Sequence, residues 1–255
     1  MQIFSEDINQ INQAYLLENN TTKILCFRIL FTILSALPWW TQIYEYNKLE
    51  VWRILTNWEF LTYWGVWSIH LYFILALVDT IYYRKYGKEY ESNIWKLTHF
   101  LFHFGFSTSL AISIMFWVAY YPDLPDNQKY NVWFMFCQIL QHVLLFLCIA
   151  TEFMYNNIRF AWVHLKLVML ALVCYMIVNL IVSLAYKPVY DSIDWVSVMC
   201  YIYIACVFIL VILYFAFAKY LYEKCKLPKI NMQNSKSDSP TIFPQGIENQ
   251  ALEKI

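Results

Sequence analysis

Placing a polar side chain inside an apolar segment costs free energy, so such residues invite a functional explanation. Two of them, a hydroxyl and an imidazole, have the chemical types of a nucleophile and a base. Thr62 carries a hydroxyl near the start of the segment 58–83, and His142 carries an imidazole within the segment 131–155. A threonine hydroxyl is a weak nucleophile until an adjacent base takes its proton, and histidine is the most frequent base. The two residues are therefore candidates for a catalytic pair. The competing structural interpretation is that Thr62 bonds to a carbonyl of its own helix.

Gln138 lies four residues before His142, so a helix places its amide on the same face as the imidazole. From the helix rise, His142 lies about 16 Å and Thr62 roughly 6–8 Å deep from the same side of the membrane. Helix tilt and the uncertainty in the segment ends are large enough to account for this difference in depth. We therefore expect Thr62 and His142 to meet in one cavity. Gln138 is expected to orient the imidazole, and Gln138 or Tyr63 to donate to a developing oxyanion.

Other polar residues of the apolar segments have structural explanations. Asp79 and Glu152 lie near the segment ends predicted to face the cytosol. We expect them to reach interfacial water or to pair with Arg84 or Arg159. Glu152 is also about 15 Å along its helix from the imidazole, which is too far to orient it. Asn179 is expected to bond a neighbouring helix.

The remaining histidines raise the question of a metal or a haem. His99 and His103 share a helix face, but no H-E-x-x-H sequence or following carboxylate accompanies them. His70 and His142 lie at similar depth, which leaves a haem between helices as an alternative. The seven cysteines are scattered without a C-x-x-C pair and are typical of small buried hydrophobes. We expect no metal site and no cofactor.

Long apolar helices must position these side chains. The chain has 255 residues, of which 60% are hydrophobic and 14% charged, against about 25% charged in soluble domains. Crossing a bilayer takes about 20 apolar residues in a helix. Six segments meet this length, namely 23–40, 58–83, 96–120, 131–155, 160–186 and 194–222. They predict an all-α polytopic membrane helix bundle with about six transmembrane helices, of which the first is weakest because it contains Arg28 and Pro38.

Three regions are expected: a cytosolic N-terminal segment over 1–22, a six-helix transmembrane domain over 23–222 and a disordered cytosolic tail over 223–255. The loops on one side would hold Lys23, Arg84, Lys85, Lys88, Lys96, Arg159, Lys219, Lys224, Lys226, Lys229, Lys236 and Lys254, and those on the other Lys48, Arg53, Lys129 and Lys187. The positive-inside rule then places both termini in the cytosol. The glycosylation sequons at Asn19 and Asn20 should stay unmodified.

Charge and composition also bear on partners and location. The net charge is zero, so no basic field indicates nucleic acid. The expected partners are the bilayer and a lipid substrate, and protein partners are left open. The expected location is an endomembrane, such as the endoplasmic reticulum, or the plasma membrane.

Three motifs in order over residues 58–155 resemble one protein family. "WEFLTY" resembles its W-x-F-L-T-[FY] helix start, "IMFWVAYYPD" its F-W-I-x-Y-x-x-D, and His142 with Glu152 its H-x(9)-E. The chain is similar in these motifs to the androgen-induced-gene family of multi-pass membrane hydrolases. The resemblance implies hydrolysis of fatty acid esters of hydroxy fatty acids, with Thr62 as the nucleophile and His142 as the assisting histidine.

The chain departs from these relatives at three positions. They have histidines where Ile139, Asn179 and Ser183 stand. "RILTNW" is similar to the Rolling stone-like membrane proteins, which makes Thr56 a second candidate threonine. Two other functions stay open. One is a non-enzymatic membrane protein, as a receptor-like bundle, a scaffold or a complex subunit. The other is a transporter or redox carrier, although the sequence shows neither the internal repeats nor the Gly/Pro-broken helices that are typical of secondary transporters.

Overall fold

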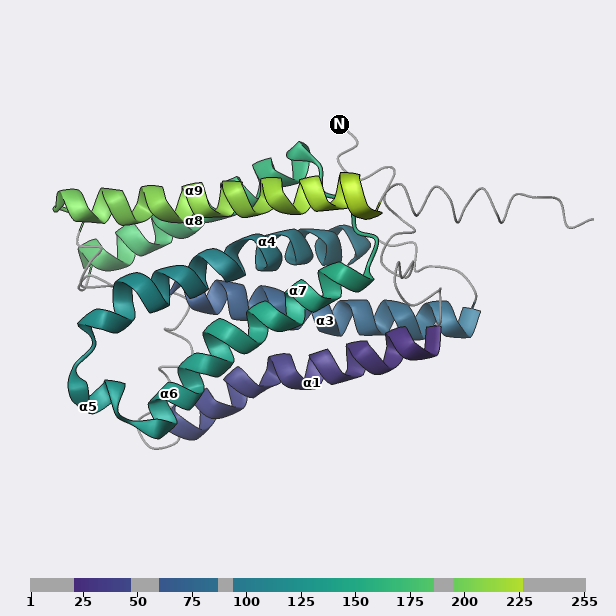
Figure 1. The fold of residues 1–255 in the computed structure, drawn as a ribbon, viewed down its shortest axis with the longest axis horizontal. Helices are drawn as coiled ribbons and strands as arrows, with labels where there is room; N and C mark the ends of the chain where they lie inside the picture. The colour runs from purple at the N-terminus through teal and green to yellow at the C-terminus, as the bar shows by residue number, and fades with distance from the viewer. Residues whose placement is uncertain (1–20, 47–59, 87–93, 186–194, 227–255) are drawn as a thin grey trace, which may run out of the picture.

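The computed structural model describes residues 21–46, 60–86, 94–185 and 195–226, and these are mostly helical (Figure 1). The α-helices are α1 (Thr21–Tyr46), α3 (Leu61–Tyr86), α4 (Ile94–Met115), α5 (Asp126–Lys129), α6 (Val132–Ile139), α7 (Leu145–Tyr155), α8 (Trp162–Ala185) and α9 (Val198–Leu221). The shorter turns are η2 (Phe116–Tyr120), η3 (Tyr121–Asp123), η4 (Leu140–Leu144) and η5 (Tyr222–Lys226). Thr56 and the sequons at Asn19 and Asn20 lie outside the described residues.

Six helical stretches of the described residues are long and apolar enough to cross a membrane. They are Thr22–Thr41, Leu61–Tyr86, Ile94–Asp123, Val132–Tyr155, Trp162–Ala185 and Val198–Lys226. The third joins α4 to η2 and η3, and the fourth joins α6, η4 and α7. The prediction of an all-α polytopic bundle is therefore confirmed, and the chain is an integral multi-pass membrane protein.

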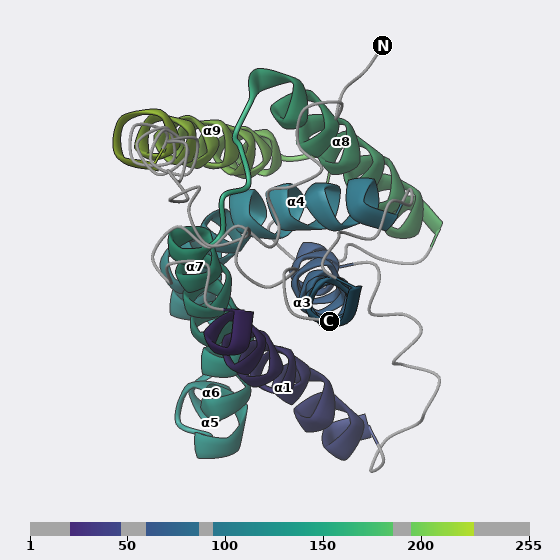
Figure 2. The ribbon, with the colours of Figure 1, turned by 90° about the vertical axis from the view of Figure 1, so that its right-hand side faces the viewer.

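Helix α4 lies in the middle of the bundle and has the largest buried share of the six spans. Helices α8 and α9 cover one side of α4, while α1, α3 and α7 lie on the other (Figure 2). Helices α8 and α9 are the least buried spans and are apolar nearly all round. Such helices are typical of a lipid-facing surface.

Helices α3 and α4 approach closely because a glycine stands at their contact. A Cβ atom at Gly105 would lie 2.7 Å from Cγ1 of Ile69, which is too close for two carbon atoms. Small residues allow this close packing in membranes, where van der Waals contact drives helix association. The start of α3 is thereby held beside the end of α4.

A buried ion pair ties three helices together. Arg28 in α1 donates to Glu152 Oε1 in α7 at 3.1 Å, and Tyr72 in α3 donates to the same oxygen at 2.8 Å. Arg28 also donates to Thr80 Oγ1 at 2.5 Å. The expectation that Glu152 reaches interfacial water is wrong, because its side chain is buried and paired with Arg28. Arg28 lies far from Glu152 in the sequence, so reasoning from neighbouring residues did not identify it as the partner.

The two ends of the bundle differ. One end holds the starts of α1, α4 and α8 and the ends of α3, α7 and α9, on the right in Figure 1. The opposite end holds α5 and the starts of α3 and α6. We refer to the latter as the α5 end, and it is here that the candidate site lies.

Candidate functional site

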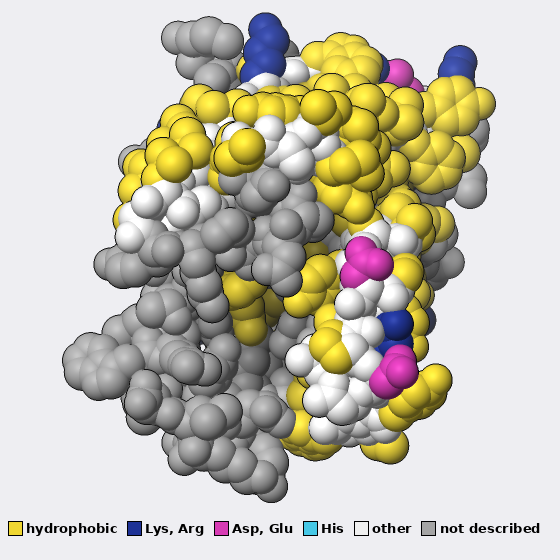
Figure 3. Space-filling model, turned by 90° about the vertical axis from the view of Figure 1, so that its left-hand side faces the viewer, with side chains coloured by type: hydrophobic (Ala, Val, Ile, Leu, Met, Phe, Trp, Pro, Cys, Tyr) yellow, Lys and Arg dark blue, Asp and Glu magenta, His cyan; other side chains and the backbone are white. Residues whose placement is uncertain are grey.

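A cavity of about 300 Å³ lies at the α5 end, where Gln128 of α5 and Thr62 in the first turn of α3 line it. Viewed from this end, the surface is hollowed, and hydrophobic side chains are visible inside the hollow (Figure 3). Its lining comes from five of the six spans and from α5. The lining residues are Phe60, Leu61, Thr62, Tyr63, Ile112, Met115, Phe116, Ala119, Tyr120, Gln128, Phe134, Gln138, Gln141, His142, Leu172, Tyr175, Met176, Tyr203, Ile204, Val207 and Phe208.

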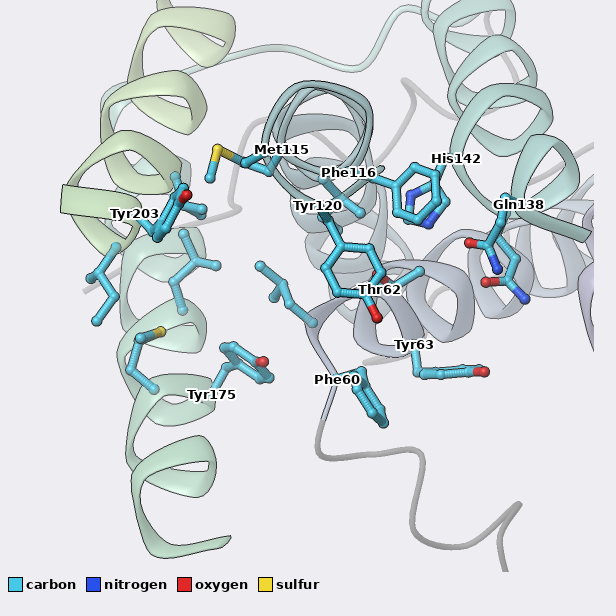
Figure 4. Close-up of a pocket in the computed structure, with 18 of the residues that line it drawn as sticks. Phe60, Thr62, Tyr63, Met115, Phe116, Tyr120, Gln138, His142, Tyr175 and Tyr203 are labelled. Carbon is cyan, nitrogen blue, oxygen red and sulfur yellow. The ribbon is translucent and has the colours of Figure 1, made fainter. Parts of the chain in front are cut away.

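The structure brings all four sequence-predicted site residues to this cavity. Thr62 and Tyr63 reach it from the first turn of α3, and Gln138 and His142 reach it from the fourth span. In Figure 4, His142 and Gln138 lie on one side, Tyr175 and Tyr203 lie on the other, and Thr62 lies between them. A hydroxyl and an imidazole that are 80 positions apart in the chain therefore line one hollow.

Thr62 is the second residue of α3 and is half-buried. Its hydroxyl makes no hydrogen bond to another described residue. Other threonines in the bundle behave differently: Thr80, Thr98 and Thr108 each donate to the carbonyl four residues earlier in their own helix. Because α3 begins at Leu61, a helical carbonyl four residues before Thr62 lies outside α3. Because of this position, the Thr62 hydroxyl has no acceptor four residues earlier within α3, and the side chain lines the cavity instead.

His142 lies in the middle of η4, a π-helical turn between α6 and α7. Its ring is buried and stacks on Phe116, with the ring centroids 4.0 Å apart and the planes 11° from parallel. The Ser113 hydroxyl donates to the His142 carbonyl. Nδ1 of the ring is buried and has no hydrogen-bond partner among the described residues. Gln138 shares the cavity but does not bond this ring, so the expectation that its amide orients the imidazole is not met in the structure.

Two further glutamines line the cavity beside Gln138. Gln141 lies next to His142 in η4, and Gln128 lies in α5. No role was assigned to Gln141 from the sequence. Its position three residues after Gln138, on the same helical face, is the signal that could have identified it. The fourth span therefore presents two amides and one imidazole to the same space.

The opposite side of the cavity is mainly apolar. It is formed by residues of α8 and α9, namely Leu172, Tyr175, Met176, Tyr203, Ile204, Val207 and Phe208. Asn179 donates to Tyr175 Oη at 3.3 Å and accepts from Trp195 Nε1 at 3.0 Å. Asn179 thus fixes the turn before α9 to α8, and it does not itself line the cavity.

The other histidines lie away from this cavity. His99, His103 and His164 are buried together in the bundle, and the rings of His103 and His164 stack with centroids 4.3 Å apart. His70 shares a 2.9 Å hydrogen bond with Ser35. Within the part of the chain that the structure describes, no group of three or more His, Cys, Asp or Glu residues is placed to hold a metal ion.

What the arrangement offers chemically is a hydroxyl, an imidazole and several amides at the edge of an apolar hollow within a membrane bundle. No family model, curated protein or solved structure matches the chain.

Proposed function

We propose that the protein is an integral membrane hydrolase of lipid esters, in which Thr62 is the nucleophile and His142 is the base. The observation that carries this proposal is that both side chains line one cavity. The motifs similar to the androgen-induced-gene family support it, because that resemblance assigns the same two roles to the same two residues.

The bond-making and proton-transfer steps use these two groups and water. His142 takes the proton of the Thr62 hydroxyl as Oγ1 attacks the carbonyl carbon of the ester. The tetrahedral intermediate collapses, the carbon–oxygen bond to the alcohol breaks, and His142 returns the proton to the leaving oxygen. His142 then takes a proton from water, which attacks the acyl-threonine. The fatty acid leaves, and the proton on His142 returns to Thr62.

The oxyanion of each tetrahedral intermediate needs donors aimed at it. Gln138 is our principal candidate, because its amide lies one helical turn from His142 and lines the same cavity. Gln141 and the Tyr63 hydroxyl are further candidates on the same lining. None of these donors carries a charge, so each would stabilise the oxyanion by a neutral hydrogen bond.

The lining suits an ester held between hydrocarbon chains. The described lining residues include no Lys, Arg, Asp or Glu, and the α8 and α9 side is aliphatic and aromatic. Helices α8 and α9 are also the least buried spans, and we propose that the lipid chain enters the cavity between helices from the bilayer. The motif resemblance narrows the proposed substrate to fatty acid esters of hydroxy fatty acids.

Orientation is part of the proposal. The end opposite α5 carries Lys23, Arg84, Lys85, Lys96, Arg159, Lys219 and Lys224 in the described residues, whereas the α5 end carries Lys129. The positive-inside rule assigns the more basic end to the cytosol. Both termini are then cytosolic, and the cavity opens toward the lumenal or extracellular side of an endomembrane or the plasma membrane.

Replacement of the hydroxyl tests the function directly. Thr62→Val keeps the shape of the side chain and removes the nucleophile, so we expect hydrolysis of the ester and labelling by a fluorophosphonate probe to disappear. Thr62→Ser should keep both, because the hydroxyl remains. Purified protein in lipid nanodiscs allows both measurements.

Thr98→Val is the matched control, because Thr98 is buried at the other end of α4 and, among the described residues, bonds only within its own helix. It should hydrolyse and label like the wild type. Full hydrolysis by folded Thr62→Val protein contradicts the proposal. A wild type that does not label, and that copurifies with stoichiometric partners, favours a non-enzymatic complex subunit.

A further inference from the structure

The orientation of the His142 ring requires an explanation, because the usual orienting group is missing. In Ser-His-Asp hydrolases a buried carboxylate accepts a hydrogen bond from the second ring nitrogen and so fixes the histidine. Here Nδ1 of His142 is buried and has no hydrogen-bond partner among the described residues. Glu152, the carboxylate that follows on the same span, is paired with Arg28.

The main chain at His142 is held instead. A π-helical turn interrupts the regular α-helical hydrogen-bond pattern, because its carbonyls pair with amides five residues on instead of four. The Ser113 hydroxyl, which is buried on α4, donates to the carbonyl of His142 in the middle of η4. This bond joins the third and fourth spans at the catalytic position.

The Ser113 hydroxyl has two carbonyl acceptors within reach. Its oxygen also lies 2.8 Å from the Ser109 carbonyl in its own helix. A serine hydroxyl has one proton to donate, and the Ser109 carbonyl already accepts a regular helical hydrogen bond from the amide of Ser113. The bond to the His142 carbonyl is the one of the two that reaches another span.

The ring itself is held from the same helix end. Phe116 lies three residues after Ser113, as the first residue of η2, and its ring stacks on the imidazole at 4.0 Å. Ser113 and Phe116 thus contact the carbonyl and the ring of one residue from neighbouring positions. π-Helical turns occur frequently at functional sites, and here η2 and η4 meet at His142.

We propose that Ser113 is a positioning residue, which holds the π-helical turn at His142 and, with Phe116, replaces the carboxylate that orients the histidine in other hydrolases. The inference rests on the proposed function for its catalytic consequence. Its structural part, the hold of Ser113 on η4, can be measured without any hydrolysis.

The test compares Ser113→Ala, Ser113→Thr and Ser109→Ala in the full chain in nanodiscs, with a fatty acid ester of a hydroxy fatty acid as the substrate. Ser109 is the matched control, because it is a buried serine of the same helix whose hydroxyl, within the described part of the chain, bonds only the Phe106 carbonyl. Ser113→Ala should lower kcat per folded molecule by roughly tenfold to a hundredfold, since a small misplacement of a catalytic group has that effect. KM should change little, Ser113→Thr should retain most activity, and Ser109→Ala should behave like the wild type.

A second readout is hydrogen exchange of the amides of residues 140–146, followed by mass spectrometry. Ser113→Ala should exchange these amides faster than the wild type, and Ser109→Ala should not. Unchanged exchange in Ser113→Ala overturns the inference, whatever hydrolysis shows. An equal loss of kcat in Ser109→Ala also overturns it. Absence of hydrolysis in the wild type would refute the proposed function alone, and the exchange comparison would still decide whether Ser113 holds the turn.

Discussion

At the scale of the residue, the site depends on which polar side chains are already bonded. Thr80, Thr98 and Thr108 donate to their own helices and have no proton left for chemistry. Thr62 stands at the start of α3 and lines the cavity. The environment, and not the residue type, therefore distinguishes the candidate nucleophile from its neighbours.

Gln138 provides a prediction at this scale. Gln138→Met keeps the length of the side chain and removes the amide. If the amide stabilises only the oxyanion, kcat should fall by roughly a hundredfold to a thousandfold while KM stays nearly constant. Steady-state kinetics of ester hydrolysis measure both constants. A raised KM with an unchanged kcat would show that the amide binds the ground state, contrary to the role proposed here.

At the scale of the element, the bundle is held by contacts that also place the cavity. Gly105 lets α4 approach α3, and the Arg28–Glu152 pair joins α1 to α7, with Tyr72 of α3 on the same carboxylate. Neither Arg28 nor Glu152 lines the cavity. Glu152 therefore acts on stability, although the motif that resembles the androgen-induced-gene family includes it together with His142.

Removing one member of this pair should destabilise the fold strongly. Arg28→Met leaves the Glu152 charge buried without its cation, which costs about 3–5 kcal/mol. The double variant Arg28→Met/Glu152→Leu should recover part of that loss, because no buried charge is left alone. Thermal unfolding in detergent compares the stability of the wild type with that of the two variants. Hydrolysis per folded molecule should stay at the wild-type level in both variants.

The exposed pair between Lys219 and Glu223 is the matched control for this experiment. Glu223→Leu should change the free energy of unfolding by less than about 1 kcal/mol, since exposed ion pairs contribute little. A loss of hydrolysis in folded Glu152→Leu protein would instead give Glu152 a part in the chemistry.

At the scale of the whole molecule, the even number of spans places the start of α1 and the end of α9 at the same end of the bundle (Figure 1). The cavity lies at the other end, where Gln128 of α5 is among its lining residues. Substrate and water would thus approach from the side opposite to both termini in the proposed orientation.

Cysteine labelling checks this orientation. Cys225 is exposed near the end of the last span, and Asp126→Cys adds a thiol in α5. In sealed microsomes with their cytosolic face outward, a membrane-impermeant maleimide should label Cys225 at once and the thiol at position 126 only after permeabilisation. Cys225→Ser, as the control, should remove the first signal. The reverse order of labelling would place the cavity on the cytosolic side.

The sequence by itself determined the number of spans, the membrane class and the polar face of the fourth span. These are local properties, because the length of an apolar run and the helical repeat do not depend on distant residues. Gln138 and His142 share a face for that reason.

Only the tertiary structure decided which distant groups meet. The partner of Glu152 is Arg28, 124 positions away, and nothing in the local pattern selects it over nearer basic residues. The same holds for Thr62 and His142, whose shared cavity depends on how α3, α4 and the fourth span pack. The π-helical turn at His142 was likewise not apparent from the periodicity, and the side chains that contact it, Ser113 and Phe116, come from another span.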